Sequence, residues 1–187
     1  MIQNIPCVIL SGGKSSRMGE DKSLLPFQNE KTLIEFQYKK LSQIFQNVYI
    51  SSKIDKFDFP CNIIYDKNEI YSPMVAIKSI LQNLDDEKVF IITVDVPLLK
   101  EETILELINS SFKDKFDVTI CADNSKTHNL IGVFRKAILP MIDSMLEEDN
   151  HKINMLLTQK LKLQTIFFKD EAQFLNINTK DDYLAFL

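Results

Sequence analysis

The amino-acid sequence predicts an α/β protein in which helices cover both faces of one mostly parallel central sheet. Short apolar runs rich in β-branched residues alternate along the chain with longer amphipathic stretches. The run Val89-Phe90-Ile91-Ile92-Thr93-Val94 is almost wholly apolar, which is typical of a central strand buried on both faces. The 187 residues contain no Gly/Ser/Pro-rich linker and no internal repeat, so we expect one domain over residues 1–187.

The first half of the chain supplies the N-terminal strands and two helices of this sheet. Short apolar, β-branched runs predict the strands, and the longer amphipathic spacing predicts the helices. Pro73 fits the first turn of a helix, where its missing N–H costs no hydrogen bond. In chain order we expect a strand at 7–10, a helix at 31–45, strands at 48–50 and 62–65, and a helix at 73–84.

The second half continues the same alternation. Thr179, with Asp182 three residues later, has the pattern of a helix cap with a reciprocal partner. His128 stands alone at the start of an apolar run, and we assign it a structural rather than a chemical role. In order we expect a strand at 89–94, a helix at 101–112, strands at 117–121 and 130–134, helices at 136–146 and 153–159, a strand at 163–168 and a helix from 179.

Composition and charge restrict the possible partners. Lys plus Arg number 22 against 26 Asp plus Glu, a net charge of -4 that argues against a binder of duplex nucleic acid or of an anionic membrane. Any phosphate site must therefore be local. The three cysteines, Cys7, Cys61 and Cys121, lack zinc-ligand spacing and are expected to be reduced core thiols. The chain shows neither a signal-peptide pattern nor a run of about 20 apolar residues, so we expect a cytoplasmic protein without a membrane partner.

The segment after the first strand has the composition of an anion-binding loop. Three of the four glycines lie within residues 12–19, and Lys14, Arg17 and Lys22 add positive charge. Glycine lets backbone N–H groups approach a ligand closely, and in open α/β sheets ligands bind at the carboxyl ends of strands. The spacing matches neither the P-loop nor the G-x-G-x-x-G dinucleotide pattern. We therefore expect a nucleotide-phosphate site of another kind.

Two aspartates follow predicted strands and are candidates for the same edge of the sheet. Asp95 ends the most apolar strand, where a carboxylate can hold Mg²⁺ against triphosphate oxygens. The alternative is a turn-capping carboxylate before Pro97. Asp66 follows the predicted strand 62–65 and, taken by itself, is an ordinary turn residue.

The pattern formed by Leu10, Gly12-Gly13, Arg17-Met18-Gly19 and Asp21-Lys22 resembles the signature of Rossmann-like nucleotidyltransferases. It is most similar to the molybdenum cofactor guanylyltransferase (MobA) branch. That resemblance implies transfer of GMP from GTP to molybdenum-bound molybdopterin, with release of pyrophosphate. A related cytidylyltransferase branch carries Ala-Gly where this chain has Gly12-Gly13, which favours guanine.

The resemblance also implies a set of site residues. Lys22 and a Mg²⁺ cofactor on Asp95 would stabilise charge at the α-phosphate, and Arg17 with the loop amides would hold the pyrophosphate. The acceptor phosphate is already ionised, so no general base is required. GTP and molybdopterin would be the substrates, and other molybdenum cofactor proteins and target molybdoenzymes the protein partners. The implied nucleotide-binding residues are Leu10, Ser11, Gly12, Gly13, Lys22, Asp66 and Asp95, and Asn176 and Asn178 of an Asn-x-Asn-Thr segment would line the pterin side.

Two departures from the family pattern keep alternatives open. Ser72 and Ala76 stand where a Gly-Pro-x-x-Gly turn is usual, and no Asn follows the second strand at residues 51–53. The alternatives are a CTP-dependent molybdopterin cytidylyltransferase and a nucleotidyltransferase acting on a sugar or alditol phosphate. An alternative of another class is a non-catalytic module that binds a nucleotide or a pterin.

Overall fold

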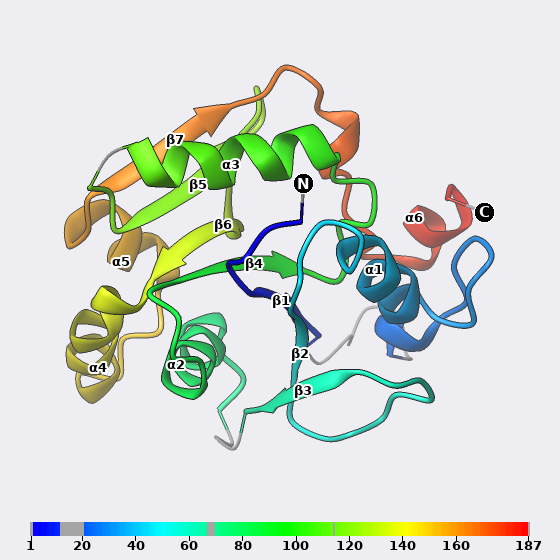
Figure 1. The fold of residues 1–187 in the computed structure, drawn as a ribbon, viewed down its shortest axis with the longest axis horizontal. Coiled ribbons are helices and arrows are strands. Elements are labelled where there is room, and N and C mark those ends of the chain that lie inside the picture. The colour runs from blue at the N-terminus through cyan, green and yellow to red at the C-terminus, as the bar shows by residue number, and fades with distance from the viewer. Residues whose placement is uncertain (1, 12–20, 67–69, 114, 187) are drawn as a thin grey trace.

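A seven-stranded sheet crosses the described part of this computed structural model, residues 2–11, 21–66, 70–113 and 115–186 (Figure 1). The strand order is β3-β2-β1-β4-β6-β5-β7. Only β6 runs antiparallel to its neighbours among these strands, which confirms the mostly parallel sheet. The strands are β1 (Cys7–Leu10), β2 (Val48–Ser52), β3 (Asn62–Tyr65), β4 (Lys88–Thr93), β5 (Val118–Ala122), β6 (Thr127–Arg135) and β7 (Leu163–Phe167).

Helices cover both faces of this sheet, as the sequence predicts. In Figure 1, α1 and α3 lie on one side of the sheet and α2 and α4 on the other. No helix of the described residues is long and apolar enough to cross a membrane. The α-helices are α1 (Leu33–Leu41), α2 (Pro73–Asn83), α3 (Glu101–Lys113), α4 (Leu139–Glu147), α5 (Ile153–Gln159) and α6 (Lys180–Leu184); short 3₁₀ turns are η1 (Lys22–Leu24), η2 (Lys136–Ile138) and η3 (Ala172–Phe174).

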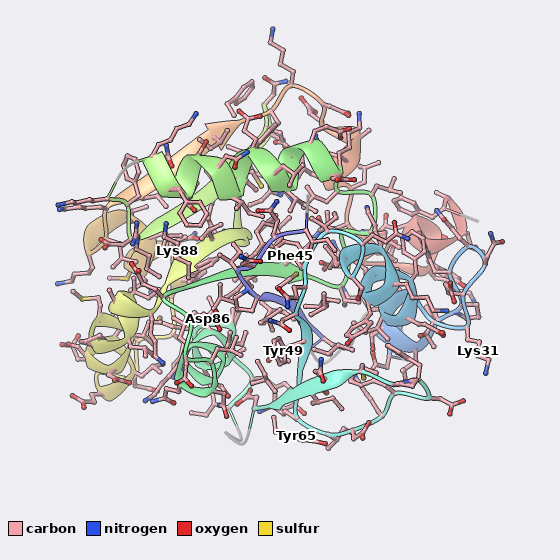
Figure 2. All side chains as sticks on the ribbon, in the orientation of Figure 1. Lys31, Phe45, Tyr49, Tyr65, Asp86 and Lys88 are labelled. Carbon is pink, nitrogen blue, oxygen red and sulfur yellow. The ribbon has the colours of Figure 1, made fainter. Side chains whose placement is uncertain are left out.

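Alternate residues of the central strands feed two separate cores. Cys7 and Ile9 of β1 pack with the helices α1 and α3, whereas Val8 and Leu10 pack with α2, α4 and α5. This follows from the two-residue period of a strand, which sends successive side chains to opposite faces. Figure 2 shows Phe45 inside the molecule, where its ring stacks on Phe90 with centroids 5.3 Å apart. Both faces of the sheet are therefore shielded from water.

Several predicted elements have different ends in the structure, and the reasons are clear for two of them. The helix expected at 31–45 is shorter, because the Thr32 side chain accepts a hydrogen bond from the Glu35 N–H at its start and Ser42 forms the C-cap. The strand expected at 130–134 is longer: β6 extends its pairing with β5 back to Thr127, across an irregularity after Ile120. The predicted reciprocal cap of Thr179 and Asp182 is confirmed at the start of α6.

The strand order creates a switch point beside β1. The chain proceeds from β1 to β2 and β3 on one side, then crosses to β4 on the other side. Leu10 and Thr93 are in register, so β1 and β4 end at the same level. In open α/β sheets the crevice at such a reversal is the usual ligand site. Ser11 and Asp95, which follow these two strands, are therefore placed at its opening.

At Gly132 of β6, the backbone of β5 lies too close to leave room for a side chain. A Cβ atom at Gly132 would lie 2.1 Å from the Thr119 carbonyl oxygen, a backbone atom that cannot move alone. We expect Gly132→Ala to lower the free energy of unfolding in urea by about 3 kcal/mol, the upper end of the usual range for overpacking. Thr127→Ala, at an exposed position of the same strand, should change it by less than about 0.5 kcal/mol. Equal stabilities of the two variants would contradict the observed strand spacing.

Candidate functional site

Lys22 and Asp95 form the centre of the candidate site. The Lys22 ammonium donates to Asp95 Oδ2 at 2.8 Å, and side chains of both residues are largely buried. It also donates to the Ile177 carbonyl at 3.2 Å and contacts Asn178 Oδ1 at 3.4 Å. Three segments that are far apart in the sequence therefore meet on one ammonium group. This contact brings together three predicted site residues, Lys22, Asp95 and Asn178.

One carboxylate oxygen of Asp95 has no hydrogen-bond donor among the residues that the structure describes. Asp95 Oδ1 is buried and lacks a hydrogen-bond partner among the described residues. The turn-capping alternative is therefore not supported, because the side chain of Asp95 accepts no described backbone N–H. The main chain of Asp95 is held separately, since its carbonyl accepts the Ile177 N–H at 2.9 Å. The carboxylate is thus fixed in position with one oxygen left for a ligand.

A cavity of about 290 Å³ adjoins Asp95. Asn176 lines the same cavity, and its Oδ1 is a second buried acceptor without a described partner. A buried acceptor that lacks a donor costs roughly 1–3 kcal/mol, so two of them on one cavity indicate a place for a cation or for ligand N–H groups. The residues around it include Thr93, Asp95, Lys126, His128, Asn129 and Asn176.

The donor set at Asp95 suits one kind of metal ion. The described residues contain no group of three or more His, Cys, Asp or Glu side chains that could enclose a metal. Mg²⁺ does not need such a cage, because it keeps several waters and binds one or two carboxylates together with substrate phosphates. Asp95 Oδ1 is a hard oxygen donor of this type. The residues present therefore fit Mg²⁺ that arrives with a nucleotide, and they do not fit a structural zinc ion.

The glycine-rich loop is described only at its two ends. Leu10 is buried at the end of β1, and the Ser11 N–H donates to the Ser51 carbonyl at 3.1 Å. Ser11 Oγ is buried without a described hydrogen-bond partner. At the other end, Asp21 accepts from the N–H and hydroxyl of Ser23 and pairs with Lys56. The predicted site residues Gly12, Gly13 and Arg17 lie outside the described residues.

Asp66 lies on the other side of β1 from Asp95. It follows β3, about two strand spacings or roughly 10 Å from β1, and so is not part of the Lys22–Asp95 contact. Lys53 pairs with it, Nζ to Oδ2 at 3.2 Å, and the same ammonium lies 4.6 Å from the Tyr71 ring centroid. The sequence did not reveal the partner of Asp66. The one feature of the sequence that points to this pair is the position of Lys53 directly after β2.

The departure at Ser72 has a structural explanation. The Ser72 hydroxyl accepts the Met74 N–H at 3.2 Å and caps α2, with Pro73 in the first turn. The backbone of Ser72 is extended, with φ of -139°, so the position does not require glycine. Ala76 packs partly buried against the core on this face. Serine at this position therefore stabilises the start of α2.

His128 is a buried residue paired with Asp123. Its Nε2 lies 2.9 Å from Asp123 Oδ2, and its ring stacks on Phe174 with centroids 4.3 Å apart. Burial lowers the pKa of His128, and the opposing effect of Asp123 is smaller. Burial alone would raise the pKa of Asp123, but hydrogen bonds from Ser125, His128 and Lys126 hold it well below its usual range. His128 is therefore neutral near pH 7 and fits the expected structural role.

Comparison with known proteins agrees with this geometry. Residues 7–164 match the family described as the MobA-like NTP transferase domain. The chain belongs to this family. It is 38% identical to a molybdenum cofactor guanylyltransferase of Campylobacter jejuni, over 99% of this chain and 96% of that protein. It is 32% identical to the protein of the same name from Helicobacter pylori, over 98% and 92% of the two chains.

A solved structure supports the Rossmann-like fold. Molybdopterin-guanine dinucleotide biosynthesis protein A from Archaeoglobus fulgidus superimposes with a TM-score of 0.82. The match covers 97% of this chain and 96% of that chain at 20% sequence identity. At this coverage the shared fold extends beyond residue 164, where the family match ends.

The buried histidine makes stability depend on pH in a definite direction. An unfolded imidazole has a pKa near 6.5, and the folded His128 has a lower pKa. Between these two values the unfolded chain binds more protons, so the free energy of unfolding should fall as the pH drops below about 6.5. The measurement is the free energy of unfolding in urea at several pH values between 5 and 7. Because one proton is involved, this free energy can change by at most about 1.4 kcal/mol per pH unit.

His128→Gln should reduce this pH dependence. His151→Gln is the matched control, because it removes the other imidazole of the chain and leaves the His128–Asp123 contact intact. If the pH dependence of stability survives in His128→Gln and vanishes in His151→Gln, it arises from His151, and the assignment to His128 is wrong.

Proposed function

We propose that this protein transfers GMP from GTP to the terminal phosphate of molybdenum-bound molybdopterin, forming the molybdopterin guanine dinucleotide. The observation that carries the proposal is the Lys22–Asp95 contact at the switch point, with Asp95 Oδ1 left without a described partner. The full-length similarity to proteins named molybdenum cofactor guanylyltransferase supports GTP as the nucleotide and molybdopterin as the acceptor.

The reaction is a phosphoryl-type substitution at the α-phosphorus of GTP. An oxygen of the acceptor phosphate forms a bond to that phosphorus, and the bond to the bridging oxygen of the β-phosphate breaks. The electron pair leaves with pyrophosphate. The acceptor phosphate has a second pKa near 6 and is largely ionised at neutral pH, so it needs no protein base. In agreement, neither histidine has a hydrogen bond to Lys22 or Asp95 within the described residues.

Charge neutralisation and positioning are then the main tasks of the protein. Lys22 would place its ammonium against the α-phosphate, where negative charge accumulates. Asp95 would hold Mg²⁺ through Oδ1, and this ion supplies charge neutralisation at the phosphate oxygens when bound. Arg17 and the amides of Gly12 and Gly13 would hold the departing pyrophosphate.

The remaining predicted residues divide between the two substrates. Leu10, Ser11 and Asp66 would contact the nucleotide. Asn176 and Asn178 would face the pterin, and this is supported by the cavity that Asn176 shares with Asp95 and by the contact of Asn178 with Lys22. The same proposal implies a cytoplasmic enzyme whose product passes to other molybdenum cofactor proteins or to molybdoenzymes.

Asp95 and Lys22 provide the direct test. With GTP labelled in the α-phosphate, molybdenum-loaded molybdopterin and Mg²⁺, we expect Asp95→Asn and Lys22→Met each to lower the transfer rate at least about 100-fold, because each removes charge that stabilises the transition state. Lys31→Met is the control, since the Lys31 side chain is 80% exposed, and it should keep the wild-type rate.

The nucleotide arm of the experiment compares GTP with CTP. Selective use of GTP supports the proposal, whereas selective use of CTP would move the protein to the cytidylyl branch. A folded wild-type protein that transfers neither nucleotide would exclude this acceptor. Full activity of Asp95→Asn would remove Asp95 from the metal role.

A further inference from the structure

Two polar side chains of α1 bind the main chain on either side of Asp95. Gln37 Nε2 donates to the carbonyls of Thr93 at 3.2 Å and Val94 at 3.3 Å, directly before Asp95. Lys40, three residues along the helix, donates from Nζ to the carbonyls of Pro97 at 2.8 Å and Leu99 at 2.6 Å, two and four residues after Asp95. One helix face thus binds four carbonyls of the segment that carries the site aspartate.

Packing alone does not explain these two residue types. Gln37 lies in the buried row of α1 together with Leu33, Ile34 and Leu41, where an apolar side chain would serve the core. Gln37 is 1% exposed. Burial lowers the pKa of Lys40, and no described carboxylate pairs with its ammonium. Both polar groups therefore obtain their hydrogen bonds from the Asp95 segment.

The same segment is also held by the C-terminal part of the chain. The Ile177 N–H donates to the Asp95 carbonyl at 2.9 Å, and the Ile177 carbonyl accepts from Lys22. The main chain around Asp95 is thus held by both α1 and Ile177, while the Asp95 carboxylate has Lys22 as its described partner. The direction of that carboxylate depends on a backbone that α1 determines from outside the crevice.

We propose that Gln37 and Lys40 are positioning residues that set the geometry of Asp95 for metal-nucleotide binding and transfer. Neither touches the substrates in this scheme; both act through the Asp95 segment. The inference rests on the proposed role of Asp95. A displacement of about 1 Å at a reacting centre can cost on the order of 100-fold in rate, so hydrogen bonds outside the crevice are sufficient to affect turnover.

Lys40→Met tests the proposal in the full-length protein, because methionine keeps an unbranched side chain and removes the donor. We expect kcat with GTP and molybdenum-loaded molybdopterin to fall about 10- to 100-fold, with the acceptor KM changed by less than about twofold. Binding of Mn²⁺ in the presence of GTP, followed by electron paramagnetic resonance without acceptor, should weaken about fivefold or more. This second measurement reports on the Asp95 site without turnover.

Three further variants separate positioning from general stability. Lys39→Met alters the neighbouring exposed lysine, which pairs with Glu30 and Glu35, and should leave kcat and Mn²⁺ binding unchanged. Lys40→Arg keeps donors at the site and should recover much of kcat. Gln37→Met removes the other pair of hydrogen bonds and should repeat the Lys40→Met pattern, so the proposal stays testable if one variant fails to fold.

The outcomes are distinct for the two proposals. Folded Lys40→Met and Gln37→Met proteins with wild-type kcat and Mn²⁺ binding would overturn the positioning role, even if both unfold more easily. In the Asp95→Asn background, Lys40→Met should weaken Mn²⁺ binding no further; an additional loss would show that Lys40 acts independently of Asp95. Full transfer by Asp95→Asn alone would instead refute the proposed function.

Discussion

The ion pair between Lys22 and Asp95 sets the requirement that the rest of the fold meets. Its two residues follow β1 and β4, and the parallel register of Leu10 with Thr93 brings those strand ends level. The C-terminal segment must then return across the sheet edge, because Ile177 binds both the Lys22 ammonium and the Asp95 main chain. Two cores, one on each face, hold this arrangement rigid. The crossover from β3 to β4 is what makes a two-sided crevice available.

Buried polar groups at the carboxyl ends of β1 and β4 lower the stability of the fold, and the two hydrophobic cores must offset this cost. Ser11 Oγ, Asp95 Oδ1 and Asn176 Oδ1 are buried without described partners, and each such group costs roughly 1–3 kcal/mol. All three lie near the carboxyl ends of β1 and β4, where a phosphate, a cation or a pterin would supply what they lack. By contrast, polar groups such as Gln37 and Lys40 are satisfied by carbonyls. Among the described residues, three of the five buried side-chain atoms that lack a hydrogen-bond partner thus lie where ligands are expected, and a bound ligand would explain them.

The sequence predicts those features that depend on local pattern or on a long motif. Strand alternation, the cap at Thr179 and the placement of Asp95 after a buried strand needed only neighbouring residues. The family resemblance supplied Lys22 and Asn178, which the structure brings together. The Lys53–Asp66 and His128–Asp123 pairs were not predicted, nor were the carbonyl contacts of α1, because each depends on how close separate elements lie after folding. Helix ends were also inexact, since a cap such as Thr32 competes with a longer amphipathic pattern.

The antiparallel direction of β6 explains how one wall of the cavity beside Asp95 is built. In a purely parallel sheet only the strand ends and the loops after them reach the ligand edge. Because β6 runs opposite to β4 and β5, its first residues, Thr127 and His128, lie at the edge where those strands end. They line the same cavity as Asp95, and Phe174, stacked on His128, links them to the segment of Asn176. In the proposed reaction, the nucleotide would bind toward β2 and β3 and the acceptor toward β6. Lys22 would then lie between them, where its ammonium could reach a phosphate shared by both substrates.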